Sequence, residues 1–228
     1  MTVRLLSRDE PGASWPVLCW EAGPGWRMIS SAVVGGGIGE RTWWLNAMVD
    51  LGYHHPDPAA HVREIAAGLG LGGGDGVGML TAADVRRWRS ARDGGVEVVA
   101  TVGLGLPVLA AEPDQEAAGA TGSPRIRPTV GTINLLAIVP EPLSDAALVN
   151  GVLTVTEAKT QALAEAGVPG TGTSSDAVCV ACPTGEPGES GRYGGPRSVW
   201  GARVARAAHT AVAEGTADWV RTHRPGWS

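Results

Sequence analysis

The sequence contains no phenylalanine and only three cysteines, and it lacks any long apolar run. Three cysteines are too few for a disulfide framework. No apolar stretch is long enough to cross a bilayer, and the amino-terminal stretch MTVRLLSRDEPG lacks the apolar region of a secretory signal. We therefore expect a cytoplasmic protein without a membrane partner.

Positive charge is also sparse. The formal net charge is −5, and only Arg86, Arg87 and Arg89 lie close together. A protein that binds nucleic acid usually presents a basic face, and no such run exists here. The sequence thus argues against a nucleic-acid partner, while self-association into a homo-oligomer is left open.

The residues that are abundant indicate a globular domain with many turns. Hydrophobic residues make up 43% of the chain, and there are 34 glycines, 16 prolines and 9 tryptophans. Extended runs and helical runs are mixed without a regular β-α-β alternation. We predict one α/β domain over residues 1–228, with one or more mixed sheets flanked by helices, for which an αββα sandwich is one arrangement. Residues 111–128 are polar and rich in Pro and Gly, and are interpreted as an internal loop.

Periodicity and end signals give the expected elements. Helices are predicted over 56–70, 81–91, the stretch from Ser144 to Gly167, and about 197–222, with Thr81 as a candidate N-cap of the second. Residues 39–52 fit either a short helix or a strand at a sheet edge. Strands are expected at 3–6, 16–20, 26–34, 96–110, 132–139 and 177–182.

Familiar motifs for metals and nucleotides are weak. Cys179 and Cys182 form a C-x-x-C pair within a strand-like run, where their side chains would point to opposite faces, so we interpret them as core residues. The glycine clusters match neither G-x-G-x-x-G nor a P-loop. His54, His55 and His61 lie beside a proline-containing turn, which favours surface histidines over a metal site. No cofactor or metal is therefore expected, and His54 is kept as a candidate for contact with the substrate.

Lys159 is the most unusual residue of the predicted helix after Ser144. At 100° per residue it falls within an apolar stripe formed by Leu148, Val152, Val155, Ala162, Leu163 and Ala166. An ammonium group in an apolar setting either shifts its pKa, pairs with a carboxylate, or extends to the edge of the stripe. Glu157 lies on the opposite face of the same helix.

Polar residues at the ends of neighbouring elements could surround that ammonium group. Thr132 and Asn134 open a buried strand before the helix, and the stretch GTGTSSDAV follows it. Hydroxyl, amide and carboxylate groups at element ends are typical of a polar pocket. We predict that Asp176 compensates Lys159, and that Thr173 and Ser175 lie close by.

The stretches GTINLLAIV, TEAKTQAL, GTSSDAVCV and YGGPRSVWG resemble the adenosylcobinamide amidohydrolases of corrinoid salvage. ISSAVVGGG, GMLTAAD and VATVGLG match the same family pattern in the same order, so the resemblance runs from about Ile29 to Val212. The pattern carries over at residues 131–134, 156–159, 172, 173 and 176. It departs at Ser174 with Ser175, at Leu106, and at Arg197 with Val199.

The resemblance implies a hydrolase that removes the aminopropanol arm of adenosylcobinamide and leaves adenosylcobyric acid. The corrinoid would be the substrate and not a cofactor. A non-catalytic corrinoid-binding protein, motivated by Leu106 and Arg197, and an amidase for another small amide are the alternatives.

Amide hydrolysis requires a nucleophile, a donor for the oxyanion and an acid for the leaving amine. Gly131-Thr132 is similar to the self-cleavage point of ornithine acetyltransferase and related amidase folds, which makes Thr132 the candidate nucleophile. Attack by water, activated by Asp176 or Glu157, is the other route. The candidate catalytic residues are thus Thr132, Lys159, Asp176 and Glu157, and the candidate substrate-binding residues are Asn134, Thr173, Ser175, Ser31, Asn46 and His54.

Overall fold

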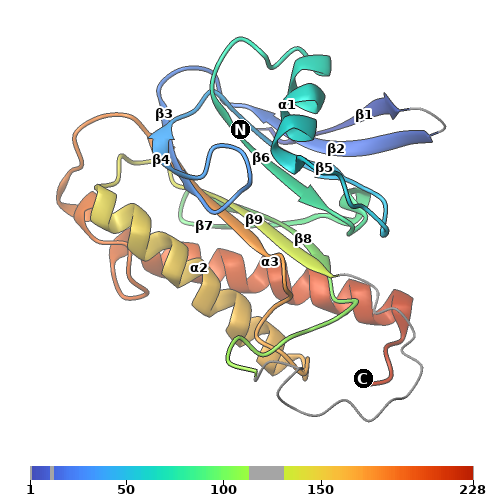
Figure 1. Cartoon of the computed structure of the whole chain (residues 1–228). Coiled ribbons are helices and arrows are strands. Elements are labelled where there is room, and N and C mark those ends of the chain that lie inside the picture. The colour runs from blue at the N-terminus through green and yellow to red at the C-terminus, as the bar shows by residue number, and fades with distance from the viewer. Residues whose placement is uncertain (1, 11–12, 113–130, 228) are drawn as a thin grey trace.

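The computed structural model describes residues 2–10, 13–112 and 131–227. Within these ranges the elements form four layers, in the order helix, sheet, sheet, helices (Figure 1). The mixed α/β architecture and the αββα arrangement expected from the sequence are confirmed. The predicted loop at 111–128 falls largely outside the described residues.

The first sheet has four strands in the order β1-β2-β5-β6. Its strands are β1 (Arg4–Glu10), β2 (Ala13–Glu21), β5 (Trp43–Met48) and β6 (Gly76–Thr81). Only β5 and β6 run parallel, so the sheet is mixed. Helix α1 (Pro58–Gly68) covers its outer face, with Asp57 as N-cap, through a cluster that includes Leu45, Val62 and Ile65.

The second sheet has six strands in the order β4-β3-β10-β9-β8-β7. Its strands are β3 (Trp26–Ser30), β4 (Gly37–Glu40), β7 (Arg89–Asp93), β8 (Val96–Gly103), β9 (Thr132–Ile138) and β10 (Ala177–Pro183). The central pair β9 and β10 runs parallel, and the other pairs run antiparallel.

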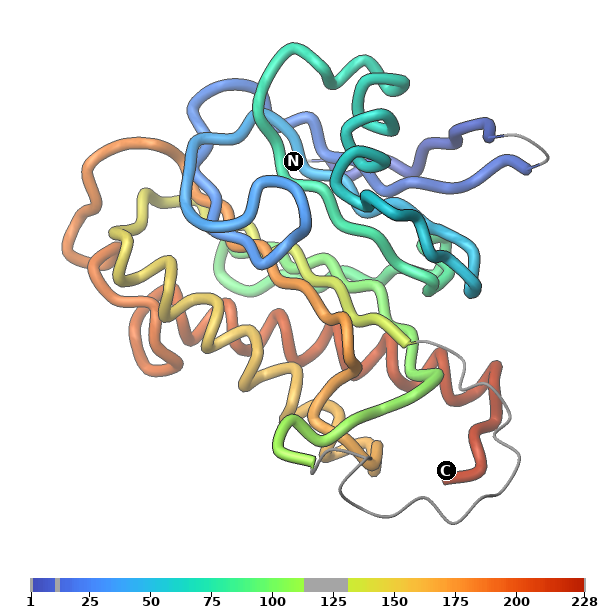
Figure 2. The backbone as a smooth tube through the Cα atoms, in the orientation of Figure 1, coloured from blue at the N-terminus to red at the C-terminus, as the bar shows by residue number. Residues whose placement is uncertain are grey.

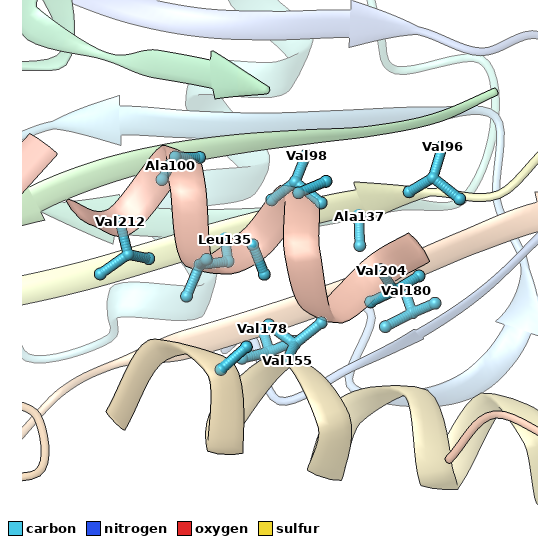
Figure 3. Packing of buried hydrophobic residues seen from close by; sticks show 14 of the residues in the cluster. Val96, Val98, Ala100, Leu135, Ala137, Val155, Val178, Val180, Val204 and Val212 are labelled. Carbon is cyan, nitrogen blue, oxygen red and sulfur yellow. The ribbon is translucent and has the colours of Figure 1, made fainter. Parts of the chain in front are cut away.

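Helices α2 (Asp145–Glu165) and α3 (Val199–His223) lie side by side on the outer face of this sheet (Figure 2). Ser144 and Ser198 cap them by accepting hydrogen bonds from backbone N–H groups in the first turn. Alternate residues of β8, β9 and β10 face the helices, and Figure 3 shows their valine, leucine and alanine side chains meeting Val155, Val204 and Val212.

The other alternate residues face the first sheet and fill the space between the two sheets. Leu136 of β9 and Cys179 of β10 meet Trp44 of β5 and Met79 of β6 there. Cys182 belongs instead to the cluster on the helix side, so the cysteine pair does point to opposite faces. Burial raises the pKa of the Cys179 and Cys182 thiols, as expected for core residues.

Three expectations from the sequence are corrected by the structure. Residues 81–91 form one 3-10 turn, Val85–Arg87, and then edge strand β7, because the alternating exposure of that strand suits pairing with β8. Thr81 ends β6, and Asp84 caps the turn instead. Residues 39–52 contain strand β5, so the strand alternative was right and the helix alternative was wrong. However, β5 is flanked by β2 and β6 and therefore does not lie at the sheet edge. Ala166, assigned to the buried stripe of α2, is exposed.

Candidate active site

A cavity of about 380 Å³ lies at one end of the sandwich, between the two sheets. Strands β3, β5 and β6 end near it, while β9 and β10 begin there. Both sheets therefore contribute loops and strand ends to one site. Its wall is formed by residues 31–33, 49–51, 53, 79–82, 132 and 175–177.

Thr132 is the first residue of β9, and only 3% of it is exposed. The alternation along β9 aims its side chain toward the other sheet, on the side of Asn134 and away from the helices. Its Oγ1 lies 2.9 Å from Ser175 Oγ, and Ser175 in turn donates to the Gly131 carbonyl over 3.2 Å. Because Ser175 uses its own hydroxyl hydrogen for that bond, it accepts a hydrogen bond from the Thr132 hydroxyl. This bond orients the lone pairs of Thr132 Oγ1.

Lys159 is buried on α2, as predicted, and its Nζ donates to Asp176 Oδ2 over 2.5 Å. The two side chains are only 8% and 12% exposed. Lys159 is also the only lysine among the 18 lysines and arginines of the chain. Removal of either partner would leave the other charge buried without compensation, so we expect the loss of Lys159 or of Asp176 to destabilise the fold strongly.

The Asp176 carboxylate is fully engaged. Oδ1 accepts hydrogen bonds from Ile133 N at 2.9 Å and Thr173 Oγ1 at 2.5 Å, and Oδ2 accepts from Thr173 N at 3.1 Å as well as from Lys159. These bonds join helix α2, the turn before β10 and the start of β9. We interpret Asp176 as the group that positions Thr132 and Ser175, since its lone pairs are already occupied.

Asn134 and Asn46 form a bridge between the two sheets. Asn134 Nδ2 donates to Asn46 Oδ1 at 2.9 Å and to the Leu80 carbonyl at 3.0 Å, and Asn46 Nδ2 donates to Thr101 Oγ1 at 2.9 Å. Both amide hydrogens of Asn134 are therefore committed within the protein, so neither is free to bind the substrate as was expected from the sequence. Asn46 has no exposed surface, so it holds the sheets together and does not reach the substrate.

Two other candidates lie away from the cavity. Glu157 is exposed and faces a different hollow, formed by α2 and α3 together with Arg197. Two residues along a helix correspond to about 200°, which turns Glu157 away from the side of Lys159. His54 is exposed, with Nδ1 at 2.7 Å from the Gly52 carbonyl, and lines a neighbouring hollow. The assignment of Glu157 to the site is corrected, whereas His54 can contact only a part of the substrate that stays outside the cavity.

The remaining candidates are in or beside the cavity. Ser31 lines it, and its Oγ accepts from Val178 N at 3.1 Å. Thr173 lies behind the wall, bonded to Asp176. The structure thus brings together Thr132, Ser175, Asp176 and Ser31 in one wall, with Lys159 and Thr173 directly behind it.

Sequence reasoning missed the wall contributed by the first sheet. Asp50 and Tyr53 follow β5, and Thr81 ends β6. Burial and the neighbouring Glu10 raise the pKa of the Tyr53 phenol. No local pattern could place these residues opposite Thr132, because the contact depends on how the two sheets stack. The signal available in the sequence was that Asp50 and Tyr53 follow directly after a buried strand, a position where loops often carry functional residues.

The architecture and the cavity define the class: a four-layer α/β protein with a paired hydroxyl site at one end of its sheets. The model of the adenosylcobinamide amidohydrolase family matches residues 3–224, and the chain belongs to that family.

Two similar proteins carry the name adenosylcobinamide amidohydrolase. The one from Halobacterium salinarum is 42% identical over 136 residues, which are 59% of this chain and 55% of the relative. The one from Methanosarcina mazei is 29% identical over 154 residues, which are 68% of each chain. The chain therefore spans about half the length of the first relative and two thirds of the second.

No helix within the described ranges combines the length and the apolar character that a membrane span requires.

Proposed function

We propose that this protein hydrolyses the amide bond that carries the aminopropanol arm of adenosylcobinamide. The products would be adenosylcobyric acid and 1-amino-2-propanol, and the acid would return to cobamide synthesis. Family membership supports the substrate class. The observation that carries the chemistry is the Thr132–Ser175 hydroxyl pair in the wall of the cavity between the sheets.

The size of the cavity fits an arm of the substrate and not the whole molecule. Ligand pockets of roughly 300–1,000 Å³ hold drug-sized molecules, and a corrinoid is larger than these. Two further hollows, of about 670 and 680 Å³, adjoin the cavity at Val49 and Asp50. The amide arm would enter the cavity while the macrocycle remains outside it, against these hollows.

In the proposed reaction Thr132 Oγ1 attacks the amide carbon. The C–N bond breaks, the amine leaves with a proton, and water then hydrolyses the ester on Thr132. Among the residues that the structure describes, the side chain hydrogen-bonded to Thr132 Oγ1 is that of Ser175, which is not a base. Cleavage between Gly131 and Thr132 would provide the missing base, because it frees the α-amine of Thr132 itself.

Intact-mass spectrometry of the purified protein shows whether the chain is cleaved between Gly131 and Thr132 or stays intact. Two fragments that meet at Gly131 and Thr132 would support self-cleavage, whereas a single full-length mass would leave Thr132 to act within an intact chain or water to attack directly. The Thr132→Ala variant serves as the control, since it should never be cut at this bond.

The competing proposal of a non-catalytic corrinoid binder is not favoured. It was motivated by Leu106 and Arg197, and neither residue lines the cavity; Arg197 belongs to the hollow between α2 and α3. Incubation with adenosylcobinamide, followed by mass spectrometry, tests the proposal. We expect release of 1-amino-2-propanol. A shift of the corrinoid spectrum without any released amine, at equal concentrations of protein and substrate, would favour the binder.

A further inference from the structure

A chain of polar side chains runs from the outside of the first sheet to the cavity wall. The Tyr53 hydroxyl lies 3.0 Å from His61 Nδ1, and His61 Nε2 lies 3.1 Å from Glu10 Oε1. Arg8 Nε donates to the same Glu10 oxygen over 2.7 Å. The four residues come from β1, from α1 and from the loop after β5, so the tertiary fold brings the chain together.

Packing holds this chain in a fixed orientation. The His61 ring packs against two others, with centroid distances of 5.6 Å to Tyr53 and 5.1 Å to His55, which lie 6.3 Å from each other, and its side chain is only 15% exposed. Arg8 is buried and also donates to the Met48 carbonyl. A functional side chain needs to be held in this way, by packing of its ring and by hydrogen bonds to its polar end.

Tyr53 connects this chain to the site. It lines the cavity that contains Thr132 and also the neighbouring hollow that contains His61. Within the described part of the cavity wall, Tyr53 is the residue hydrogen-bonded to a histidine. The other groups considered for proton transfer are engaged, because Lys159 is paired with Asp176 and both Asn134 hydrogens are donated.

We propose that Tyr53 is a further catalytic residue, which protonates the departing amine, while His61 and Glu10 act as positioning residues that supply the proton. This inference rests on the proposed amide hydrolysis. As the C–N bond breaks, the amine nitrogen takes the Tyr53 O–H proton. The phenol oxygen takes the Nδ1 proton of a protonated His61, and Glu10 stabilises that imidazolium until the transfer. The proton that Thr132 loses on attack passes to solvent, and His61 takes one proton back from solvent, so the protons balance and no phenolate accumulates.

The chain contains two tyrosines, which gives a matched test. Tyr53→Phe keeps the ring stack and removes only the hydroxyl, and Tyr193→Phe makes the same change at a residue that is 68% exposed and outside the cavity. With adenosylcobinamide we expect Tyr53→Phe to lower kcat by about 100-fold with little change in KM, as general acid catalysis predicts, and Tyr193→Phe to leave both unchanged.

A second substrate separates an acid from a purely structural residue. In the p-nitrophenyl ester of the same corrinoid acid, the leaving group departs as a stable anion and needs no proton. Tyr53→Phe should therefore cleave this ester at close to the wild-type rate. An equal loss with the amide and the ester would overturn the assignment of an acid, and so would an unchanged kcat with the amide.

A positioning role for His61 is tested in the same way. His61→Gln should lower kcat for the amide but spare the ester, while His209→Asn, which removes another histidine paired with a glutamate, should affect neither. If wild-type protein releases no amine, the proposed function fails. If the wild type is active and Tyr53→Phe equals it with both substrates, only the assignment of Tyr53 fails.

Discussion

Replacing Lys159 with methionine should destabilise the protein far more than a comparable change at the surface. Methionine fills a similar apolar volume but leaves the Asp176 carboxylate, which is 12% exposed, without its cation. Removing one partner of a buried ion pair typically costs about 3–5 kcal/mol. Asp176 keeps three hydrogen bonds from Ile133 and Thr173, so we expect the lower end, about 3 kcal/mol.

For a chain of this length such a loss lowers Tm by about 6–12 °C. Urea unfolding followed by tryptophan fluorescence measures the free energy directly, and Arg63→Met, at an exposed cation of α1, is the control. The double variant Lys159→Met/Asp176→Asn removes both charges. It should be less destabilised than the sum of the two single variants, by about 0.5–3 kcal/mol.

Lysine chemistry gives an independent measurement of the same burial. Because Lys159 is the only lysine, an amine-directed reagent has one side-chain target in the whole chain. We expect the folded protein to be modified only at α-amino groups, and Lys159 to react once the protein is unfolded. Rapid labelling of Lys159 in the folded state, or a Lys159→Met variant as stable as Arg63→Met, would show that Lys159 is not held in a buried ion pair.

Three further predictions concern other parts of the structure. A Cβ on Gly172 would lie 2.3 Å from Asp176 Oδ2 and 2.4 Å from Lys159 Nζ, so Gly172→Ala should lower both stability and turnover, whereas Gly188→Ala, where a Cβ meets nothing within 4 Å, should be neutral in both assays. Burial raises the pKa of the Cys19 thiol to about 11, so a thiol reagent at pH 8 should react with Cys19 only after unfolding; labelling in the folded state would contradict its burial. Burial opposes ionisation of Asp218, but hydrogen bonds from Arg221 and Arg87 and the charge of Arg89 outweigh it and lower its pKa. Asp218→Asn should therefore cost about 1–2 kcal/mol at neutral pH, a modest value because the arginines are partly exposed. In the wild type this contribution is present above the unfolded pKa of about 4 and is lost as pH falls through the lowered folded value, so urea midpoints of the two proteins should converge in acid; a gap that persists there would contradict the assignment.

Local patterns were sufficient for most elements and for half of the site. The apolar stripe of α2 predicted that Lys159 is buried, and the strand ends predicted that Thr132, Ser175 and Asp176 lie near it. These inferences hold because helix periodicity and the ends of adjacent parallel strands determine proximity over short distances.

The parts that sequence reasoning missed depend on contacts between layers. Tyr53 lines the cavity because the first sheet stacks on the second, and the sequence around Tyr53 shows only that the segment follows a buried strand. Asn134 was expected to face the substrate, but it meets Asn46 from the opposite sheet. The predicted helix at 81–91 failed because pairing of β7 with β8 outweighed local helix signals, as tertiary context often does.

The rate of amine release by variants of Thr132 measures directly whether the Thr132 hydroxyl is the nucleophile. Thr132→Ser keeps a hydroxyl within reach of Ser175, and Thr132→Ala removes it. Thr210→Ala, at an exposed position of α3, is the control. We expect Thr132→Ala to lose at least about 1,000-fold in kcat for adenosylcobinamide while it still binds the corrinoid, and Thr132→Ser to retain activity. Full turnover by Thr132→Ala would show that the Thr132 hydroxyl is not the nucleophile.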